Sequence, residues 1–230
     1  MVELVAAIVL GSLPGVIWLW FYLKEDDYPK SKKLLFLTFL SGGLFVILAI
    51  FAEYFSGILL GKINIAKLSP LAFLIFALIE EVSKFLAAYI IVHKSSKFRE
   101  PVEAMVYMIV AALGFATVEN IISIANLTIS NPAQGAFLSG AVQLAALRLV
   151  GATLLHTLTS GLVGYWWAMS IRRFFDFRYL VLGLIIATFA HMAFNLLVLI
   201  FGEVSYALLF LVVMGFFLLG DFEKLKRIEV

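Results

Sequence analysis

The sequence predicts an all-α integral membrane protein, because it is strongly apolar and its apolar residues fall in stretches of membrane-spanning length. Of the 230 residues, 63% are hydrophobic and only 14% are charged, and the mean hydropathy is +1.08. A soluble domain is closer to half apolar, because polar side chains must cover its surface. The bilayer is therefore the expected solvent for most of this protein. No hydrophilic stretch is long enough for a second domain, so we expect residues 1–230 to form a single transmembrane domain.

Seven stretches are long enough to cross the bilayer as helices. A transmembrane helix needs about 20 predominantly apolar residues to cross a hydrocarbon core of about 30 Å. The predicted spans are residues 2–23, 34–60, 69–92, 102–126, 148–170, 179–201 and 205–220. The apolar interval 133–147 would make the fifth span far too long for a bilayer if the two were joined. We therefore expect a separate short helix there, lying at the membrane interface or dipping partway in.

Basic residues predict the orientation of these spans. Positive charges in short loops mark the cytoplasmic side of a membrane protein. Most of the 17 lysine and arginine residues lie in the loops after the first, third and fifth spans or in the C-terminal tail, whereas the alternate loops hold only Lys62 and Lys67. We therefore expect a multi-pass protein of the cell membrane with its N-terminus outside and its C-terminus in the cytoplasm.

Other features of the composition exclude some functions. The sequence has no cysteine, which excludes disulfides, thiolate catalysis and cysteine-ligated zinc. The net charge of +2 gives no indication of a nucleic-acid partner. The sequence also contains no Gly-x-Ser-x-Gly nucleophile motif, no Gly-rich phosphate loop and no His-Glu-x-x-His zinc motif.

Polar side chains interrupt four of the predicted spans at membrane depth. They occur in the third to sixth spans: Glu80, Glu81, Lys84, Glu119, His156, His191 and Asn195. Each charged group near the bilayer centre costs about 2.5–3.5 kcal/mol, so such groups are expected to pair with one another inside the bundle. Glu80 and Lys84 are four residues apart and share a helix face, as do His191 and Asn195. We therefore expect one interior cavity, with Glu119 and His156 toward its outer side.

Residue types alone leave several functions open. Two histidines and several carboxylates can hold Zn²⁺ and keep one carboxylate as a base for a bound water. A buried carboxylate can instead activate water without a metal, while an amide such as Asn195 donates to the developing oxyanion. The same groups could form the relay of a proton-coupled transporter or channel. The paired internal repeats typical of many transporters are not evident in this sequence. The chain could also be a catalytically silent membrane binding protein.

The polar motifs, taken in order, resemble those of the PrsW family of intramembrane proteases. The motifs are Glu80-Glu81-x-x-Lys84, Gly114-Phe115-x-x-x-Glu119-Asn120, an isolated His156 and His191-x-x-x-Asn195. Arg148 and the segment Glu100-Pro101-x-Glu103 also resemble the family pattern. The resemblance covers about residues 71–197, which we expect to be the functional core. The family is distantly similar to the CAAX-prenyl-endopeptidase membrane proteins.

The resemblance implies an intramembrane endopeptidase that hydrolyses peptide bonds of membrane-protein substrates within or beside the bilayer, toward the outer face. Anti-sigma factors are the substrates that it suggests. Either Glu80 or Glu81 is then the general base for water, and Lys84 holds the glutamate pair in position. Asn195 orients the substrate or stabilises the oxyanion.

A divalent metal, with zinc as the candidate, is one version of this mechanism. Its predicted ligands are His156, His191 and Glu119. In a metal-free version, His191 and Asn195 stabilise the oxyanion and Glu119 orients the water. The sequence leaves the choice between the two versions open.

Overall fold

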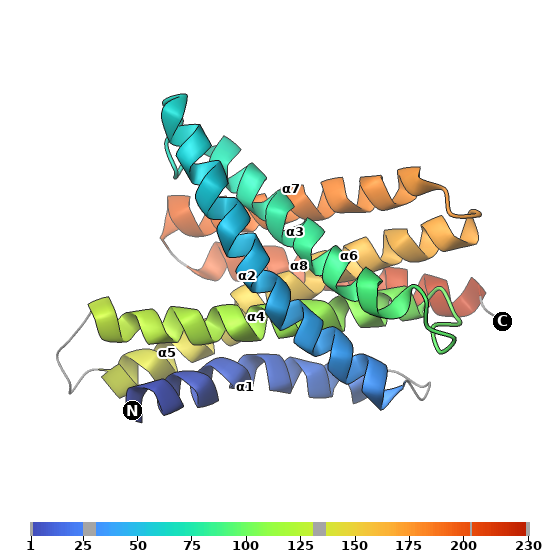
Figure 1. Ribbon diagram of the computed structural model, residues 1–230, viewed down its shortest axis with the longest axis horizontal. Helices are drawn as coiled ribbons and strands as arrows, with labels where there is room; N and C mark the ends of the chain where they lie inside the picture. The colour runs from blue at the N-terminus through green and yellow to red at the C-terminus, as the bar shows by residue number, and fades with distance from the viewer. Residues whose placement is uncertain (1, 25–30, 131–136, 203, 229–230) are drawn as a thin grey trace.

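The computed structural model describes residues 2–24, 31–130, 137–202 and 204–228, and the regular structure in them is helical throughout. Eight α-helices follow one another: α1 (Val2–Lys24), α2 (Lys32–Lys62), α3 (Pro70–Val92), α4 (Glu103–Ser130), α5 (Phe137–Val150), α6 (Ala152–Arg172), α7 (Phe177–Phe201) and α8 (Val204–Ile228). They form an elongated bundle in which α5 and α6 follow one another as a single pass (Figure 1). The predicted all-α fold is confirmed, and most predicted spans agree closely with these helices.

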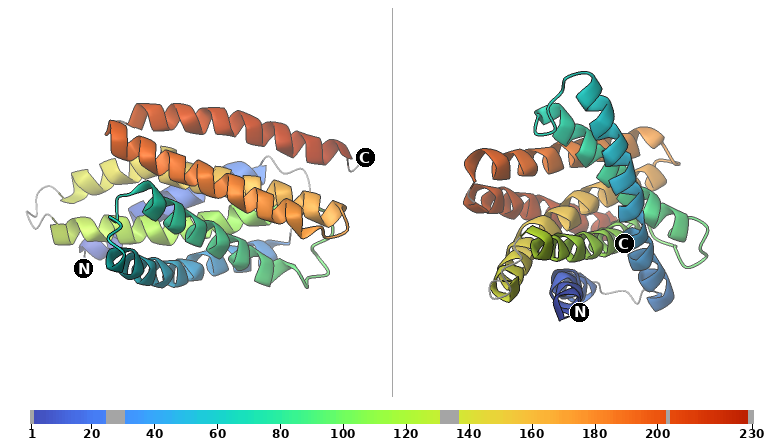
Figure 2. Two further views of the ribbon diagram at one scale, coloured as in Figure 1. Left: turned by 90° about the horizontal axis from the view of Figure 1, so that it is seen from above. Right: turned by 60° about the vertical axis from the view of Figure 1, so that its left-hand side comes forward.

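The bundle has the length and composition of a multi-pass membrane protein. Six segments of the described chain are long and apolar enough to cross a membrane, and one of them, Phe137–Arg172, contains both α5 and α6. Helix α3 is not among the six; it carries the charged side chains of Glu80, Glu81 and Lys84. The start of α1 and the end of α8 lie at opposite ends of the bundle (Figures 1 and 2), as seven passes require.

The pass formed by α5 and α6 is broken in its middle. The sequence predicted one span over 148–170, but α5 ends at Val150 with Arg148 in its last turn, and α6 begins at Ala152. Gly151 between them has φ −104° and ψ −96°, which lies outside the helical region. The predicted short helix is therefore separate, as expected, but it ends later; its predicted first residues, 133–136, lie outside the described part of the chain. Hydropathy could not detect the break because the two residues that flank Gly151, Val150 and Ala152, are apolar.

Helix α1 supports this break from the side. The Nε1 atom of Trp18 donates to the carbonyl oxygen of Leu149, at 2.8 Å, just before the break. The hydroxyl group of Tyr22 donates to Oγ1 of Thr157, at 3.3 Å, just after it. Carbonyl groups at the end of a helix have no partner within that helix, and they need one where water is scarce. Trp18 supplies such a partner.

Helix α4 is the central helix and packs against α1, α2 and α6. Its crossing with α2 depends on two glycines. A β-carbon on Gly42 would overlap the carbonyl oxygen of Ala111, and one on Gly114 would overlap that of Phe39. Small residues let membrane helices approach until their backbones touch, which gives them van der Waals contact that lipid cannot replace. Gly114 therefore has a packing role within the motif that also contains Glu119.

We expect Gly114→Ala to destabilise the protein, because α2 and α4 must separate to admit the methyl group. Overpacking of a tight contact costs about 1–3 kcal/mol. Gly220→Ala is the matched control, since a β-carbon at Gly220 meets nothing within 4 Å. Thermal unfolding in detergent should give a lower midpoint for Gly114→Ala and an unchanged or higher midpoint for Gly220→Ala. Equal midpoints would contradict the tight crossing.

The predicted orientation can be tested with single cysteines, because the chain has none of its own. Ser96 lies between α3 and α4, and Ile63 lies between α2 and α3, at the other end of α3. We expect an impermeant maleimide to label Ser96→Cys only from the cytoplasm and Ile63→Cys only from outside. Labelling of both variants from the same side would contradict the predicted topology.

Candidate active site

A polar cavity of about 520 Å³ lies between α3, α4, α6 and α7, beside the break at Gly151. The polar side chains that line it are those of Glu80, Glu119, Arg148, His156, His191 and Asn195. Apolar side chains such as Phe73, Leu155 and Phe194 form the rest of its wall. Five of the seven residues predicted for the site therefore border one cavity. The remaining two, Glu81 and Lys84, lie directly behind it with no exposed side-chain surface.

The carboxylate of Glu81 joins three helices behind the cavity. Its Oε1 atom accepts hydrogen bonds from Lys84 Nζ at 2.6 Å, from Thr159 Oγ1 at 3.0 Å and from His191 Nδ1 at 2.8 Å. These donors come from α3, α6 and α7, respectively. Charge-assisted hydrogen bonds are the stronger kind, and here they are shielded from water. Glu81 is therefore placed to fix the other residues rather than to meet a substrate.

The bond to Glu81 determines which nitrogen of His191 is available. An ionised carboxylate can only accept hydrogen bonds, so Nδ1 of His191 carries the proton. In a neutral ring, the Nε2 atom then keeps its lone pair. This atom lies 3.8 Å from Oε2 of Glu80, and His191 is 2% exposed. A carboxylate thus orients the histidine from behind, an arrangement common around metal sites.

A carboxylate also orients His156, but it binds the other ring nitrogen. Its Nε2 atom lies 2.7 Å from Oε2 of Glu119, so Nε2 donates. Its Nδ1 atom accepts from Lys84 Nζ at 3.2 Å and lies 3.7 Å from Oε2 of Glu80. The Lys84 ammonium group also lies 5.7 Å from the centre of the Phe115 ring, a favourable cation–π distance. The lone pairs of both histidines therefore lie near Glu80.

Glu119 is held in place by a chain of polar contacts across the helix break. Arg148 Nη2 lies 2.8 Å from Glu119 Oε1, and Arg148 Nε donates to Asn120 Oδ1. Asn120 Nδ2 donates in turn to Thr153 Oγ1 at 3.0 Å. Arg148 precedes the break and Thr153 follows it, so α4 holds both sides. These contacts give Arg148 and Asn120 a role in positioning Glu119.

Glu80, His156 and His191 form a group that fits a divalent cation. Their three ligand atoms lie within 4.8 Å of one another, and no hydrogen-bond donor in the described chain reaches Oε2 of Glu80. Ligand atoms in a tetrahedral zinc site lie about 3.4 Å apart, given bonds of about 2.0–2.1 Å. The distances of 3.7 and 3.8 Å from Glu80 to the two histidines need only small adjustments to match. The geometry favours Glu80 over Glu119 as the third ligand, because Glu119 binds the other nitrogen of His156.

Sequence reasoning missed one carboxylate of this cluster. Glu53, on α2, lies close enough to Glu80 and Glu119 for their charges to interact. With Glu53 included, four carboxyl groups face two basic side chains, those of Lys84 and Arg148. The cluster therefore has an excess of negative charge if every carboxyl group is ionised, and a divalent cation would balance it. The signal in the sequence was a lone carboxylate in an apolar span, the same signal that identified Glu119.

Two other features have different roles. Glu103, in the segment that resembled the family pattern, accepts a hydrogen bond from the backbone nitrogen of Arg99 at the start of α4, at 2.8 Å, and does not line the cavity.

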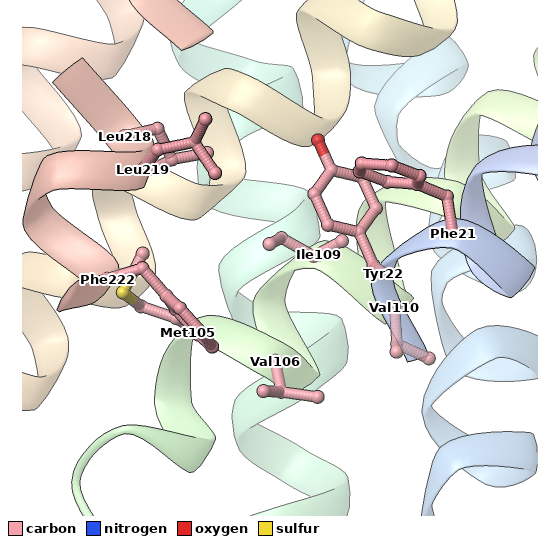
Figure 3. Close-up of a pocket in the computed structure, with 9 residues that line it drawn as sticks. All are labelled: Phe21, Tyr22, Met105, Val106, Ile109, Val110, Leu218, Leu219 and Phe222. Carbon is pink, nitrogen blue, oxygen red and sulfur yellow. The ribbon is translucent and has the colours of Figure 1, made fainter. Parts of the chain in front are cut away.

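A second, apolar pocket of about 60 Å³ lies between α1, α4 and α8. Figure 3 shows side chains such as Phe21, Ile109 and Leu218 facing one another there. The described residues that line it include no carboxylate or histidine, so the hydrolytic chemistry is expected in the polar cavity.

Comparisons with known proteins agree with the geometry. A sequence model of the PrsW family of intramembrane metalloproteases matches residues 30–220. The protease PrsW of Geobacillus kaustophilus (strain HTA426) is 36% identical over 113 residues, which is 49% of this chain. The match covers 49% of that relative, so it spans about half the length of each protein. No solved structure matches the chain.

Metal binding tests the ligand set without requiring a substrate. We expect the purified protein to bind about one divalent ion per chain, as a mononuclear site does, and to lose it when both His156 and His191 are replaced by Ala. Glu119→Gln should still bind the ion but about 10–100-fold more weakly, the usual effect of losing a residue that orients a ligand. His93→Ala is the control, since His93 is exposed at the end of α3. Titration with elemental analysis would contradict this ligand set if Glu119→Gln bound no metal while Glu80→Gln bound it normally.

Proposed function

The chain belongs to the PrsW family of intramembrane metalloproteases, and we propose that it is an endopeptidase that hydrolyses peptide bonds of membrane proteins within or beside the bilayer. The observation that carries this proposal is the convergence of three lone pairs, those of Glu80 Oε2, His156 Nδ1 and His191 Nε2, at one polar cavity. Such a site can bind and polarise a water molecule. Membership of this family favours hydrolysis over a transporter that would use the same side chains as a proton relay.

Glu80 is the best candidate for the general base. Glu80 lines the cavity, and its Oε2 atom has no donor among the described residues, so the carboxylate can accept a proton from a water held between the two histidines. Glu81 is an unsuitable base, because it is fully buried and its Oε1 atom already accepts three hydrogen bonds. A positioned base contributes about 10²–10⁴-fold to a rate. The glutamate pair thus divides its tasks: Glu80 moves the proton, and Glu81 holds Lys84 and His191.

The residues present fit a divalent metal, with zinc as the candidate. His156, His191 and Glu80 would hold the ion, so in this version Glu80 would be a ligand and not the base, and Glu119 and Glu81 would orient the two histidines from outside. A bound divalent ion lowers the pKa of its water and polarises the carbonyl group of the substrate. Asn195, one helical turn from His191 on the cavity wall, can donate to the oxygen of the scissile carbonyl as negative charge develops there.

One contact favours a metal-free version of the same reaction. Lys84 Nζ lies 3.2 Å from His156 Nδ1, so the ammonium group and a metal ion would compete for that lone pair. In this version, Lys84 supplies the fixed positive charge, Glu80 activates the water, and His191 and Asn195 face the scissile carbonyl. The elemental analysis described above distinguishes the two versions, because the metal-free version remains fully active without any bound ion.

The side of the membrane on which cleavage occurs follows from the topology that the basic loops predict. A peptide bond inside lipid is protected, because its polar groups are paired within a helix, so a substrate must unwind before it can be cut. The cavity provides polar partners for such a segment. Glu119 and Arg148 lie toward the predicted outer side, so we propose cleavage in the outer half of the bilayer or just outside it. By family resemblance, an anti-sigma factor is the first substrate to test, with the protein in the cell membrane.

We expect Glu80→Gln to abolish cleavage while leaving the fold intact. The substitution keeps the shape of the side chain but removes its basicity, so turnover should fall by about 100-fold or more. Glu81→Gln should instead lower the thermal midpoint, since it leaves the buried Lys84 without its charged partner. Glu223→Gln, an exposed carboxylate on α8, is the control.

The measurement uses purified wild type and variants reconstituted with a single-span membrane substrate, and the cut is mapped by mass spectrometry. Undiminished cleavage by Glu80→Gln would refute the assignment of the base. A cut on the cytoplasmic side would refute the proposed orientation.

A further inference from the structure

A second polar cavity, of about 290 Å³, lies between α2 and α3 beside the loop that joins them. Two oppositely charged side chains, Glu53 and Lys67, line it together with Ile50, Tyr54, Gly57, Ile58 and Phe76. A buried water needs about 30 Å³ and two to four polar partners, so this cavity has room for several waters and groups to bind them. The two charged side chains make water, rather than a lipid chain, the expected occupant.

Glu53 connects this cavity to the active site. The side chain lines the second cavity, and it lies close enough to Glu80, which lines the first, for their charges to interact. The two cavities therefore meet at a pair of carboxyl groups, one from α2 and one from α3. Both groups can bind water, so a molecule held by Glu53 is already next to the residue that would activate it.

Hydrolysis within a membrane needs such a connection. Each cleaved bond consumes one water, yet a substrate segment in the first cavity displaces water from the side of Glu80 that it covers. Lipid surrounds the helices elsewhere and carries almost no water. The second cavity approaches Glu80 through Glu53, on the side of α2. We propose that this cavity, next to the α2–α3 loop, is the water inlet of the active site, and that Glu53 passes water from it to Glu80. This inference rests on the proposed protease function.

Two glycines on α2 allow a matched test, because the chain has no cysteine. Gly57 lines the inlet, and a β-carbon there would meet only Lys67 Cε, at 3.9 Å. Gly61 lies one turn further along the same helix, outside the lining of the cavity, and a β-carbon there meets nothing within 4 Å. Gly57→Cys and Gly61→Cys are each assayed in detergent before and after reaction with a bulky, water-soluble methanethiosulfonate. A reducing agent then removes the label.

We expect the thiol of Gly57→Cys to react, which requires water in the inlet. The label should then lower kcat about tenfold or more with little change in KM, since it obstructs water rather than substrate. The reducing agent should restore kcat, which separates obstruction from unfolding. Labelled Gly61→Cys should keep its activity. Glu53→Leu should also lower kcat, whereas Glu53→Gln, which still binds water, should retain most of it.

Three results would overturn the inlet. They are a thiol in Gly57→Cys that a water-soluble reagent does not modify, full modification without loss of kcat, and wild-type turnover by Glu53→Leu. In each case, an active wild type would leave the proposed function standing. A wild type that cleaves none of the membrane substrates would instead refute the proposed function, and the inlet with it.

Discussion

The buried carboxylate of Glu81 is the interaction on which the rest of the site depends. One of its oxygen atoms accepts hydrogen bonds from α3, α6 and α7, and two of the donors, Lys84 and His191, belong to the site itself. In the interior of a membrane protein, a charge without a partner is costly, and breaking a buried ion pair costs about 3–5 kcal/mol. The three helices are therefore held at the spacing that keeps Glu81 paired. That spacing also brings Nδ1 of His156 and Nε2 of His191 toward Glu80.

The sequence predicted the helices well, because a single physical quantity, the length of apolar stretches, determines them. It also identified the residues of the cavity, because a charged or amide side chain in an apolar span needs a polar partner. Their individual roles could not be predicted. Glu119 and Glu80 are both carboxylates near His156, and only the three-dimensional arrangement shows that Glu119 binds Nε2 while Glu80 lies near Nδ1. Helical spacing gives the face of a side chain but not the nitrogen that it meets.

Two features were missed because they are not encoded in the polar motifs. Glu53 belongs to a span whose other residues gave no reason to connect it with α3, and the contact depends on how α2 crosses the bundle. The break at Gly151 is placed by tertiary contacts, namely those of Trp18 with Leu149 and of Arg148 and Thr153 with Asn120. Helix α1, which supplies Trp18, lies before residue 30, where the match to the family begins. A helix outside the matched region thus supports the part of the backbone that borders the cavity.

The two histidines present different ring nitrogens toward Glu80, Nδ1 in His156 and Nε2 in His191, and they are therefore not equivalent groups. The amide oxygen of asparagine occupies nearly the position of Nδ1, and that of glutamine nearly the position of Nε2. An asparagine is thus the closest isostere for the working atom at position 156, and a glutamine for that at position 191. With the two exchanged, a glutamine at position 156 would place its acceptor oxygen too far from the backbone, and an asparagine at position 191 would place it too close. The site is therefore asymmetric. At each position, the distance from the backbone to the nitrogen that faces Glu80 matters as much as the chemistry of the imidazole ring.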